Sequence, residues 1–280
     1  QYLEGGQDPL AIAMERRTGL AVEPARDGQQ LLPGKVYLGP GDRHLLLMNG
    51  VIRLGNGSRE NRHRPSADVL FRSAAAHQAG RTVGALLTGA SHDGAVGLAE
   101  LVKAGGLAVV QNPQEAVRPE MPRAALSSVP EAQVSSLEDM PKVLLQLLEQ
   151  EAQETSPPSP RLQRELHFAL APPSQNVAGF ETGELVPLSC PECGGGLWRS
   201  STGPLHYRCH TGHAFSPESL LAAQSEEVER ALYVALRVLE ERVSLLEQMG
   251  PRGLGPAFDD RLAESRQEVE LLRRVLMGED

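Results

Sequence analysis

The chain has 280 residues, a formal net charge of −9, an apolar fraction of 40% and an aromatic fraction of 4%. The length predicts about two folded parts, with a core built largely from Leu, Val and Ala. The 36 acidic and 27 basic residues argue against a general nucleic-acid binder, which would carry a basic face. Three cysteines exclude a disulfide-stapled scaffold. No apolar run reaches the roughly 18 residues of a membrane span, and no signal-peptide pattern is present, so we expect a cytoplasmic protein without membrane insertion.

The first 150 residues alternate between strand and helix patterns. The expected elements are strands at 35–38 and 45–54 around a turn at 39–42, a helix at 65–78, a strand at 83–87, a loop at 88–94, a helix at 95–104 and a strand at 107–110. The last two strands are apolar without alternation, as expected of strands buried on both faces. Strand, helix and strand in this order predict a parallel α/β sheet with a right-handed crossover.

The loop at 88–94 is the first place to look for chemistry, because ligands of parallel sheets bind at the carboxyl ends of the strands. It reads Thr-Gly-Ala-Ser-His-Asp-Gly. Asp93 has two interpretations, which can both hold: it caps the following helix, or it orients a catalytic histidine. A self-contained triad of Ser91, His92 and Asp93 is not expected, because consecutive side chains diverge.

Several motifs follow one another in a fixed order along roughly residues 1–140. They are Asp27-Gly28-Gln29, the stretch from Leu32 to His44, the stretch from Arg62 to Phe71, the stretch from Leu86 to Ala95, Ala104-Gly105-Gly106, Gln111-Asn112 and the stretch from Met121 to Ala125. Together they resemble the catalytic domain of the chemotaxis protein-glutamate methylesterases.

The resemblance implies a doubly wound α/β hydrolase domain with a Ser-His-Asp triad and no cofactor for catalysis. Such enzymes hydrolyse glutamate methyl esters on bacterial chemoreceptors, and members can also deamidate receptor glutamines, so a methylated chemoreceptor or a similar signalling protein is the implied partner. Asp93 matches the triad aspartate, which would stabilise the imidazolium. Gly89, Ala90 and Gly94 match the active-site loop; Ala90 replaces a methionine of the family's oxyanion site, where a backbone N–H could still serve.

Two family motifs are missing from this chain. The nucleophile of the family lies in a Gly-x-Ser-x-Gly-Gly loop and its base is a later histidine, and the elements that carry them should precede Gln1. Ser58 has no Gly-Gly after it and is not expected to replace the nucleophile. We therefore expect an N-terminally incomplete methylesterase that is inactive when expressed alone. The alternative is an inactive interaction protein of a chemotaxis-like pathway.

All three cysteines lie between positions 190 and 209. Cys190 and Cys193 form a C-x2-C knuckle, and Cys209 is followed by His213 at x3, which is the arrangement of a tetrahedral structural zinc site. His210 is an alternative fourth ligand, and Trp198 is expected to shield the metal.

The domain organisation follows from a proline-rich stretch. Pro157, Pro158 and Pro160 predict a semi-extended linker. We expect a methylesterase-like domain at 1–150, the linker at 151–180, a small zinc ribbon at 181–216 and an α-helical hairpin with a coiled-coil-like seam at 217–280. The hairpin either packs only on itself or supports self-association or docking.

Overall fold

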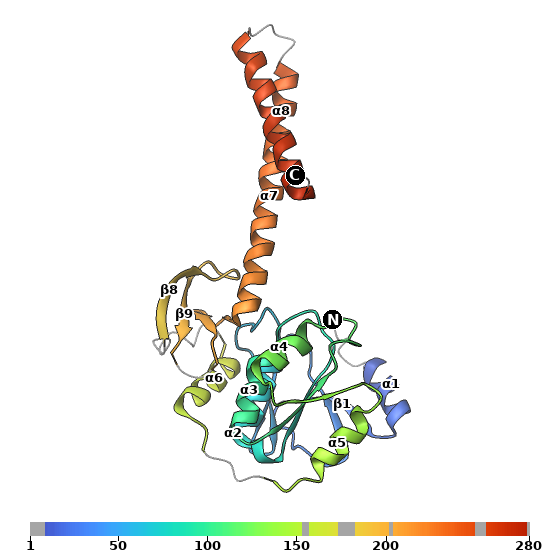
Figure 1. Cartoon of the computed structure of the whole chain (residues 1–280). Coiled ribbons are helices and arrows are strands. Elements are labelled where there is room, and N and C mark those ends of the chain that lie inside the picture. Colours follow the sequence, from blue (N-terminus) through green and yellow to red (C-terminus); the bar gives the residue numbers. More distant parts are fainter. Residues whose placement is uncertain (1–8, 153–156, 173–182, 202–203, 250–255, 279–280) are drawn as a thin grey trace. The chain divides into compact units, whose positions relative to one another are not determined.

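The structure is a computed structural model that describes residues 9–152, 157–172, 183–201, 204–249 and 256–278 (Figure 1). Of the predicted linker, residues 153–156 and 173–180 lie outside the described residues. So do residues 181–182 of the predicted zinc ribbon and residues 250–255 of the predicted hairpin. The chain forms two units, Gln1–Leu220 and Leu221–Asp280. In the described residues, no helix is both long and apolar enough to cross a membrane.

A three-stranded parallel sheet organises the first unit. Its strands are β5 (Val83–Leu86), β6 (Leu107–Gln111) and β7 (Gln133–Ser135), in that order. Helix α3 (Ala95–Lys103) connects β5 to β6, as the βαβ pattern predicts, and α4 (Glu120–Ser128) lies between β6 and β7 along the chain. The chain is therefore an α/β protein with a parallel sheet.

Helices cover both faces of the central strand β6. Ala108 and Val110 share a core with α2 (Ala67–His77), α3 and α4, whereas Val109 packs against α5 (Met140–Leu148). Alternate residues of a strand point to opposite faces, so an apolar run such as β6 requires a helix layer on each side.

The N-terminal elements differ from the prediction. Helix α1 (Pro9–Thr18) is followed by β1 (Ala21–Pro24), which pairs in parallel with β2 (Lys35–Leu38). The predicted strand at 45–54 is wrong: it is a hairpin of β3 (His44–Met48) and β4 (Val51–Gly55). Asn49 and Gly50 turn the chain with φ angles of 51° and 78°, the left-handed values that tight hairpins need and that Asn-Gly adopts readily. A short 3-10 helix, η1 (Ala79–Arg81), precedes β5.

Part of the predicted linker is a core helix. Helix α6 (Pro160–Leu170) is capped by Ser159, whose side chain accepts a hydrogen bond from the Leu162 amide at 3.2 Å. Leu162, Leu166 and Ala169 are buried in the same core as β5 and β6. The linker prediction is wrong here because Pro160 occupies the first helical position, where proline is well tolerated.

The cysteine-containing segment forms an antiparallel sheet of order β11-β10-β9-β8 within the first unit. Its strands are β8 (Gly183–Ser189), β9 (Gly196–Ser200), β10 (Tyr207–Cys209) and β11 (Ala214–Phe215). We call this segment the ribbon.

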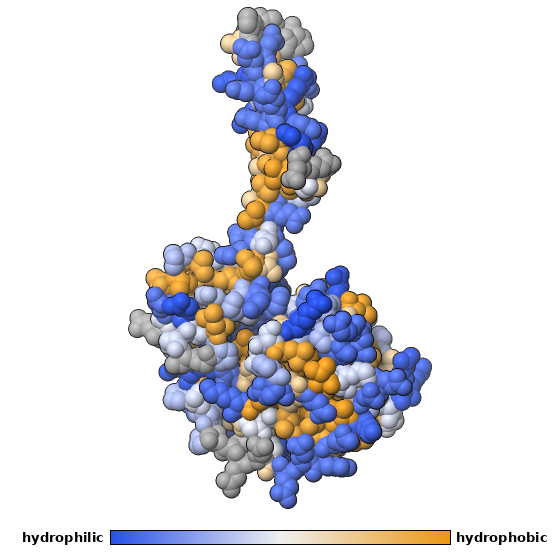
Figure 2. All heavy atoms as spheres, in the orientation of Figure 1, coloured by the Kyte–Doolittle hydropathy of each residue, from blue (hydrophilic) through white to orange (hydrophobic). Residues whose placement is uncertain are grey.

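The second unit contains most of α7 (Pro217–Met249) and all of α8 (Pro256–Met277). Figure 2 shows apolar side chains gathered over the middle part of α7. The two helices are joined by the ion pairs Arg242–Glu268 at 3.1 Å, Arg266–Glu247 at 2.6 Å and Arg273–Glu240 at 2.8 Å. Such exposed pairs each contribute about 0–1 kcal/mol, but together they favour the antiparallel arrangement.

If α6 is part of the core, Leu166→Ala will lower the free energy of unfolding by about 2–5 kcal/mol, because it leaves a cavity beside the sheet. Urea denaturation of the purified chain measures this. The control Gln163→Ala lies on the exposed face of the same helix and should change stability by about 0.5 kcal/mol or less. Equal, small effects of the two changes would show that α6 contributes nothing to the core.

Candidate functional site

Asp93 lies in the loop that follows β5 and is 6% exposed. Its Oδ1 accepts hydrogen bonds from the Ser66 hydroxyl at 2.6 Å and from the Asp68 amide at 3.2 Å, and its Oδ2 accepts from the Ala67 amide at 2.6 Å. These donors form the N-terminus of α2, where free amides and the helix dipole stabilise a negative charge. The carboxylate of Asp93 therefore caps α2.

The expectation that Asp93 caps the following helix is wrong. Gly94 occupies that N-cap position with a φ of 94°, a conformation that favours glycine. A Cβ atom at Gly94 would also lie 2.6 Å from Leu86 Cδ1. The glycine lets the loop turn sharply, so that Asp93 faces α2 across the loop.

A second buried carboxylate lies beside Asp93. The Asn61 side-chain nitrogen donates to Asp68 Oδ2 at 2.6 Å and, more weakly, to Asp93 Oδ1 at 3.5 Å. The Gly97 amide donates to Asp68 Oδ1 at 2.6 Å. Burial and repulsion from Asp93 raise the pKa of Asp68 to about 7, although Arg72 and the Gly97 amide oppose the rise. Asp68 was missed by the sequence analysis, since nothing in its spacing from Asp93 indicates that the two carboxylates meet.

In the rest of the predicted active-site loop, the backbone groups of Gly89 already make hydrogen bonds to other parts of the chain. The Gly89 amide donates to the Arg118 carbonyl at 2.9 Å, and the Gly89 carbonyl accepts from the Met121 amide at 3.0 Å. A Cβ atom at Gly89 would collide with the Met121 side chain. Gly89 therefore shapes the loop, and the amides of Ala90 and Gly94 remain the candidates for binding an oxyanion.

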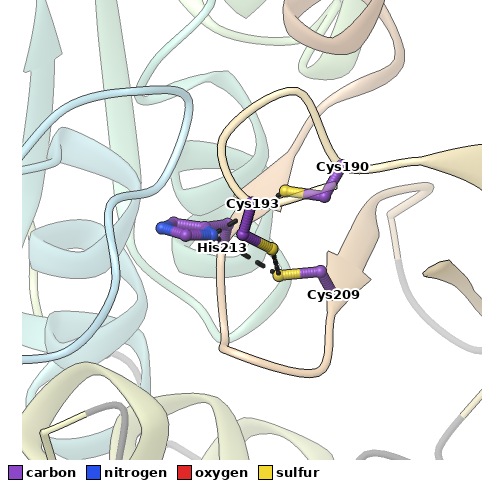
Figure 3. Close-up of side chains that lie close together, drawn as sticks. All are labelled: Cys190, Cys193, Cys209 and His213. Carbon is purple, nitrogen blue, oxygen red and sulfur yellow. Dashed lines mark hydrogen bonds between the residues drawn. The ribbon is translucent and has the colours of Figure 1, made fainter. Parts of the chain in front are cut away.

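The predicted metal ligands come together at one end of the ribbon (Figure 3). The three cysteine sulfurs and a ring nitrogen of His213 all lie within 4.8 Å of one another. Cys190 and Cys209 are buried, Cys193 is exposed and His213 is half-buried. Hydrogen bonding from Cys190, with smaller contributions from His213 and Thr211, lowers the pKa of the Cys209 thiol to about 2 against the effect of burial.

Two further residues of the ribbon differ in their placement. The exposed His210 lies over Gly195, where an added Cβ atom would collide with the imidazole, and it is not part of the cluster. The sequence analysis expects Trp198 to shield the metal, but the side chains that pack with Cys190 and Cys209 include Leu197 and Phe215 and not Trp198. Trp198 lines a small pocket beside Glu165 and His206, because neighbouring residues of β9 face opposite sides.

A buried group of charges joins the ribbon to the parallel-sheet part of the first unit. Glu60 and Glu165 share Arg72 and Arg208: Arg208 Nη2 lies 3.0 Å from Glu60 Oε1 and also binds Glu165, and Arg72 binds Glu60. His206 Nε2 lies 3.2 Å from Glu165 Oε1. Burial alone would raise the pKa of Glu165, but Arg208 and His206 hold it well below its usual range. We call these five residues the buried charge network.

Comparison with known proteins identifies the family to which the chain belongs. Residues 3–144, about half of the chain, match the family described as CheB methylesterase. The chain belongs to this family.

The relatives found are named protein-glutamate methylesterase/protein-glutamine glutaminase. The relative from Yersinia pestis bv. Antiqua (strain Antiqua) is 46% identical over 122 residues, which are 42% of this chain and 35% of the relative. The relative from Thiobacillus denitrificans is 38% identical over 147 residues, which are 51% of this chain and 41% of the relative. The chain thus spans well under half the length of these relatives.

A solved structure is also similar to part of the chain. The CheB methylesterase catalytic domain of Thermotoga maritima aligns with a TM-score of 0.48 and 28% identity, covering 51% of this chain and 78% of that domain. The family match ends at residue 144, so α6, the ribbon, α7 and α8 follow it in the chain.

The raised pKa of Asp68 predicts a pH-dependent stability. Between about pH 4 and pH 7 the folded state keeps a proton on Asp68 that the unfolded state has lost, so this stabilising contribution disappears as the pH rises through that window. Asp68→Asn cannot lose a proton. We therefore expect the variant to gain stability relative to the unmodified chain from pH 4 to pH 7, by about 1.4 kcal/mol for each unit of pKa shift, and then to stay level.

Urea denaturation of both proteins at several pH values measures this difference. The comparison removes titrations that the two proteins share. A difference in stability that is constant from pH 4 to pH 8 would contradict the raised pKa.

Proposed function

We propose that residues 1–150 contribute to a protein-glutamate methylesterase, which hydrolyses glutamate methyl esters on a bacterial chemoreceptor or a similar signalling protein and can deamidate glutamines there. The observation that carries the proposal is the family match over residues 3–144, which contain Asp93 at the carboxyl end of a parallel strand. The names of the relatives support the same chemistry.

Asp93 is proposed to orient the histidine base of a Ser-His-Asp triad. An ionised carboxylate has about four positions for hydrogen-bond donors. In the described residues, Oδ1 is engaged by Ser66, Asp68 and, weakly, Asn61, whereas Oδ2 is engaged by the Ala67 amide. Oδ2 therefore has capacity for one more donor, and an imidazole N–H would fill it. A carboxylate in that position fixes the tautomer of the histidine and stabilises its protonated form.

This chain supplies one member of the proposed triad. The partners of Asp93 in the described part of the chain include no histidine. Ser58 is buried and its hydroxyl donates to the Thr211 carbonyl, whereas a nucleophilic serine would donate to the histidine base. Gly89 fixes the loop, and the Ala90 or Gly94 amide is proposed to bind the oxyanion that forms on the substrate carbonyl.

A chimera tests the role of Asp93. Residues 3–144, which match the family, replace the corresponding part of the Yersinia pestis relative, and methanol release from a methylated chemoreceptor is measured. Asp93→Asn in the chimera should lower kcat by about 10⁴-fold, the size of effect known when a triad aspartate is lost elsewhere. Glu131→Gln, a change at an exposed carboxylate, is the matched control and should leave the rate unchanged.

The 280-residue chain alone provides the second arm of this experiment. It should release no methanol above background, because it lacks the family's serine loop and histidine. Full activity of the Asp93→Asn chimera would refute the assigned role, and hydrolysis by the isolated chain would refute its expected inactivity.

We propose as a second candidate that α7 and α8 support self-association, which is the role a scaffold protein would need. Each helix leaves apolar side chains exposed in addition to its contact with the other helix. On α7 they include Tyr233, Val234 and Val238, and on α8 Leu271 and Val275, each between 45% and 56% exposed. Residues three or four apart share one face of a helix, so Val234 and Val238 form one apolar stripe, as do Leu271 and Val275.

Multi-angle light scattering of the full chain tests this second proposal. We expect the mass of a dimer at micromolar concentration and a shift to monomer on Val238→Glu, because a buried unpaired charge opposes association. Ser244→Glu adds the same charge at an exposed polar position of α7 and should leave the dimer intact. A monomeric unmodified chain at all concentrations would exclude self-association.

A further inference from the structure

The Cys190–His213 cluster lies beyond the family match and is not used by the proposed hydrolysis. In a tetrahedral site with Zn–S bonds of about 2.3 Å and a Zn–N bond of about 2.0 Å, two sulfurs lie about 3.8 Å apart and a sulfur and a nitrogen about 3.5 Å apart. Here Cys193 Sγ lies 3.6 Å from Cys209 Sγ. His213 Nδ1 lies 3.5 Å from Cys209 Sγ and 3.7 Å from Cys190 Sγ. These separations match the edges of a zinc-centred tetrahedron.

Two tight turns hold the ligands in pairs. Around the first pair, the Gly194 amide donates to the Cys190 carbonyl and the Cys190 amide to the Gly195 carbonyl, both at 2.8 Å. Around the second pair, the Cys209 amide donates to the His213 carbonyl at 3.0 Å. The backbone therefore fixes each pair by itself, and a metal ion would join the two pairs.

The segment that carries His213 is bound to the parallel-sheet part of the first unit by the loop at 58–61. The Asn61 amide donates to the Ala214 carbonyl at 2.8 Å, and the Ser216 amide donates to the Asn61 side-chain oxygen at 2.9 Å. The Ser58 hydroxyl donates to the Thr211 carbonyl. All three partners in the ribbon lie within three residues of His213, so the position of this ligand and the position of the loop are coupled.

Asn61 extends this contact to the acidic pair. Its side-chain oxygen binds the ribbon, and its side-chain nitrogen donates to Asp68 and Asp93 at 2.6 and 3.5 Å. Asn61 is 5% exposed and has a φ of 48°, a left-handed conformation that asparagine tolerates better than most residues. One buried side chain thus contacts both the ribbon and the loop of the proposed catalytic aspartate.

We propose that Cys190, Cys193, Cys209 and His213 bind a structural zinc ion. The ion would hold the ribbon against the loop at 58–61 and so keep Asn61 in contact with Asp68 and Asp93; we call this effect the lock. Four protein ligands leave no open position on the metal, which therefore has a structural role. The buried charge network holds the neighbouring residue Arg208 and keeps the ribbon attached at a second place. Asn61 is a positioning residue for Asp93; its relevance to hydrolysis rests on the proposed function, whereas the zinc site and the lock do not.

Metal analysis of the purified full chain tests the site. After incubation with zinc and dialysis, we expect about one zinc per chain, and cobalt in its place should give the visible and thiolate charge-transfer bands of a tetrahedral site. His213→Ala should lose the metal or these bands. His210→Ala changes the neighbouring exposed histidine and should retain them. Less than half an equivalent in the unmodified chain, or loss on His210→Ala with retention on His213→Ala, would overturn the proposed ligand set.

Hydrogen exchange followed by mass spectrometry tests the lock. Removal of zinc by a chelator should accelerate exchange at the start of α2, residues 67–70, by about tenfold or more, and zinc addition should restore protection. Peptides from α4 (residues 120–128) serve as the internal reference.

Asn61→Ala isolates the connection. It should keep its zinc but show the faster exchange at 67–70, whereas Asn56→Ala, a change at an exposed asparagine of the same segment, should behave like the unmodified chain. If the exchange rate at residues 67–70 changes neither on zinc removal nor on Asn61→Ala, the lock is refuted, and the metal site is not affected by that result. Neither readout depends on ester hydrolysis, so the proposed function can fail separately.

Discussion

The buried charge network is the constraint on which the arrangement of the first unit depends. Glu60, Arg72, Glu165 and Arg208 come from a loop, two helices and the ribbon, and each is at most 6% exposed. Taking these charges out of water is costly, and the cost is offset only while all four remain paired. Removing one partner would leave an unpaired buried charge and destabilise the unit by about 3–5 kcal/mol. Correct pairing therefore requires that the four segments assemble together.

Asp93 caps α2, and we propose that the same carboxylate also orients the histidine base. The N-terminus of α2 supplies the hydrogen-bond donors that offset the cost of burying the Asp93 carboxylate. The same donors hold the carboxylate in one orientation, in which Oδ2 has capacity for one more donor. The neighbouring Asp68 has its pKa raised to about 7 because it is buried next to that charge. The loop thus places two carboxyl groups close together in the interior, and the pKa of Asp68 rises as a result.

Much of the fold could be predicted from the sequence because its signals are local. The apolar runs of β5 and β6 and the helical spacing of α2 and α3 identified the parallel sheet, and the C-x2-C knuckle identified residues that the structure brings together. Asn49-Gly50 is also a local signal for a hairpin, and the hairpin of β3 and β4 turns there. The cap of α2 by Asp93 and the pairing of Glu60 with Arg208 join residues 25 or more positions apart, and no periodicity reports such contacts. The linker prediction is wrong at 160–170 because proline disrupts a helix interior but is well tolerated at the first helical position, which Pro160 occupies.

The core position of α6 has a consequence for how such a chain can be inherited. The family match ends at residue 144, yet Leu162, Leu166 and Ala169 complete the same core as the parallel sheet. A segment that is attached to a domain but shares no core with it can be exchanged between genes by recombination. Here the extension contributes side chains to the interior, so domain and extension must change in step, and recombination at the family boundary would leave both halves with exposed apolar surface. In this protein the segment that matches the family model is shorter than the first folded unit.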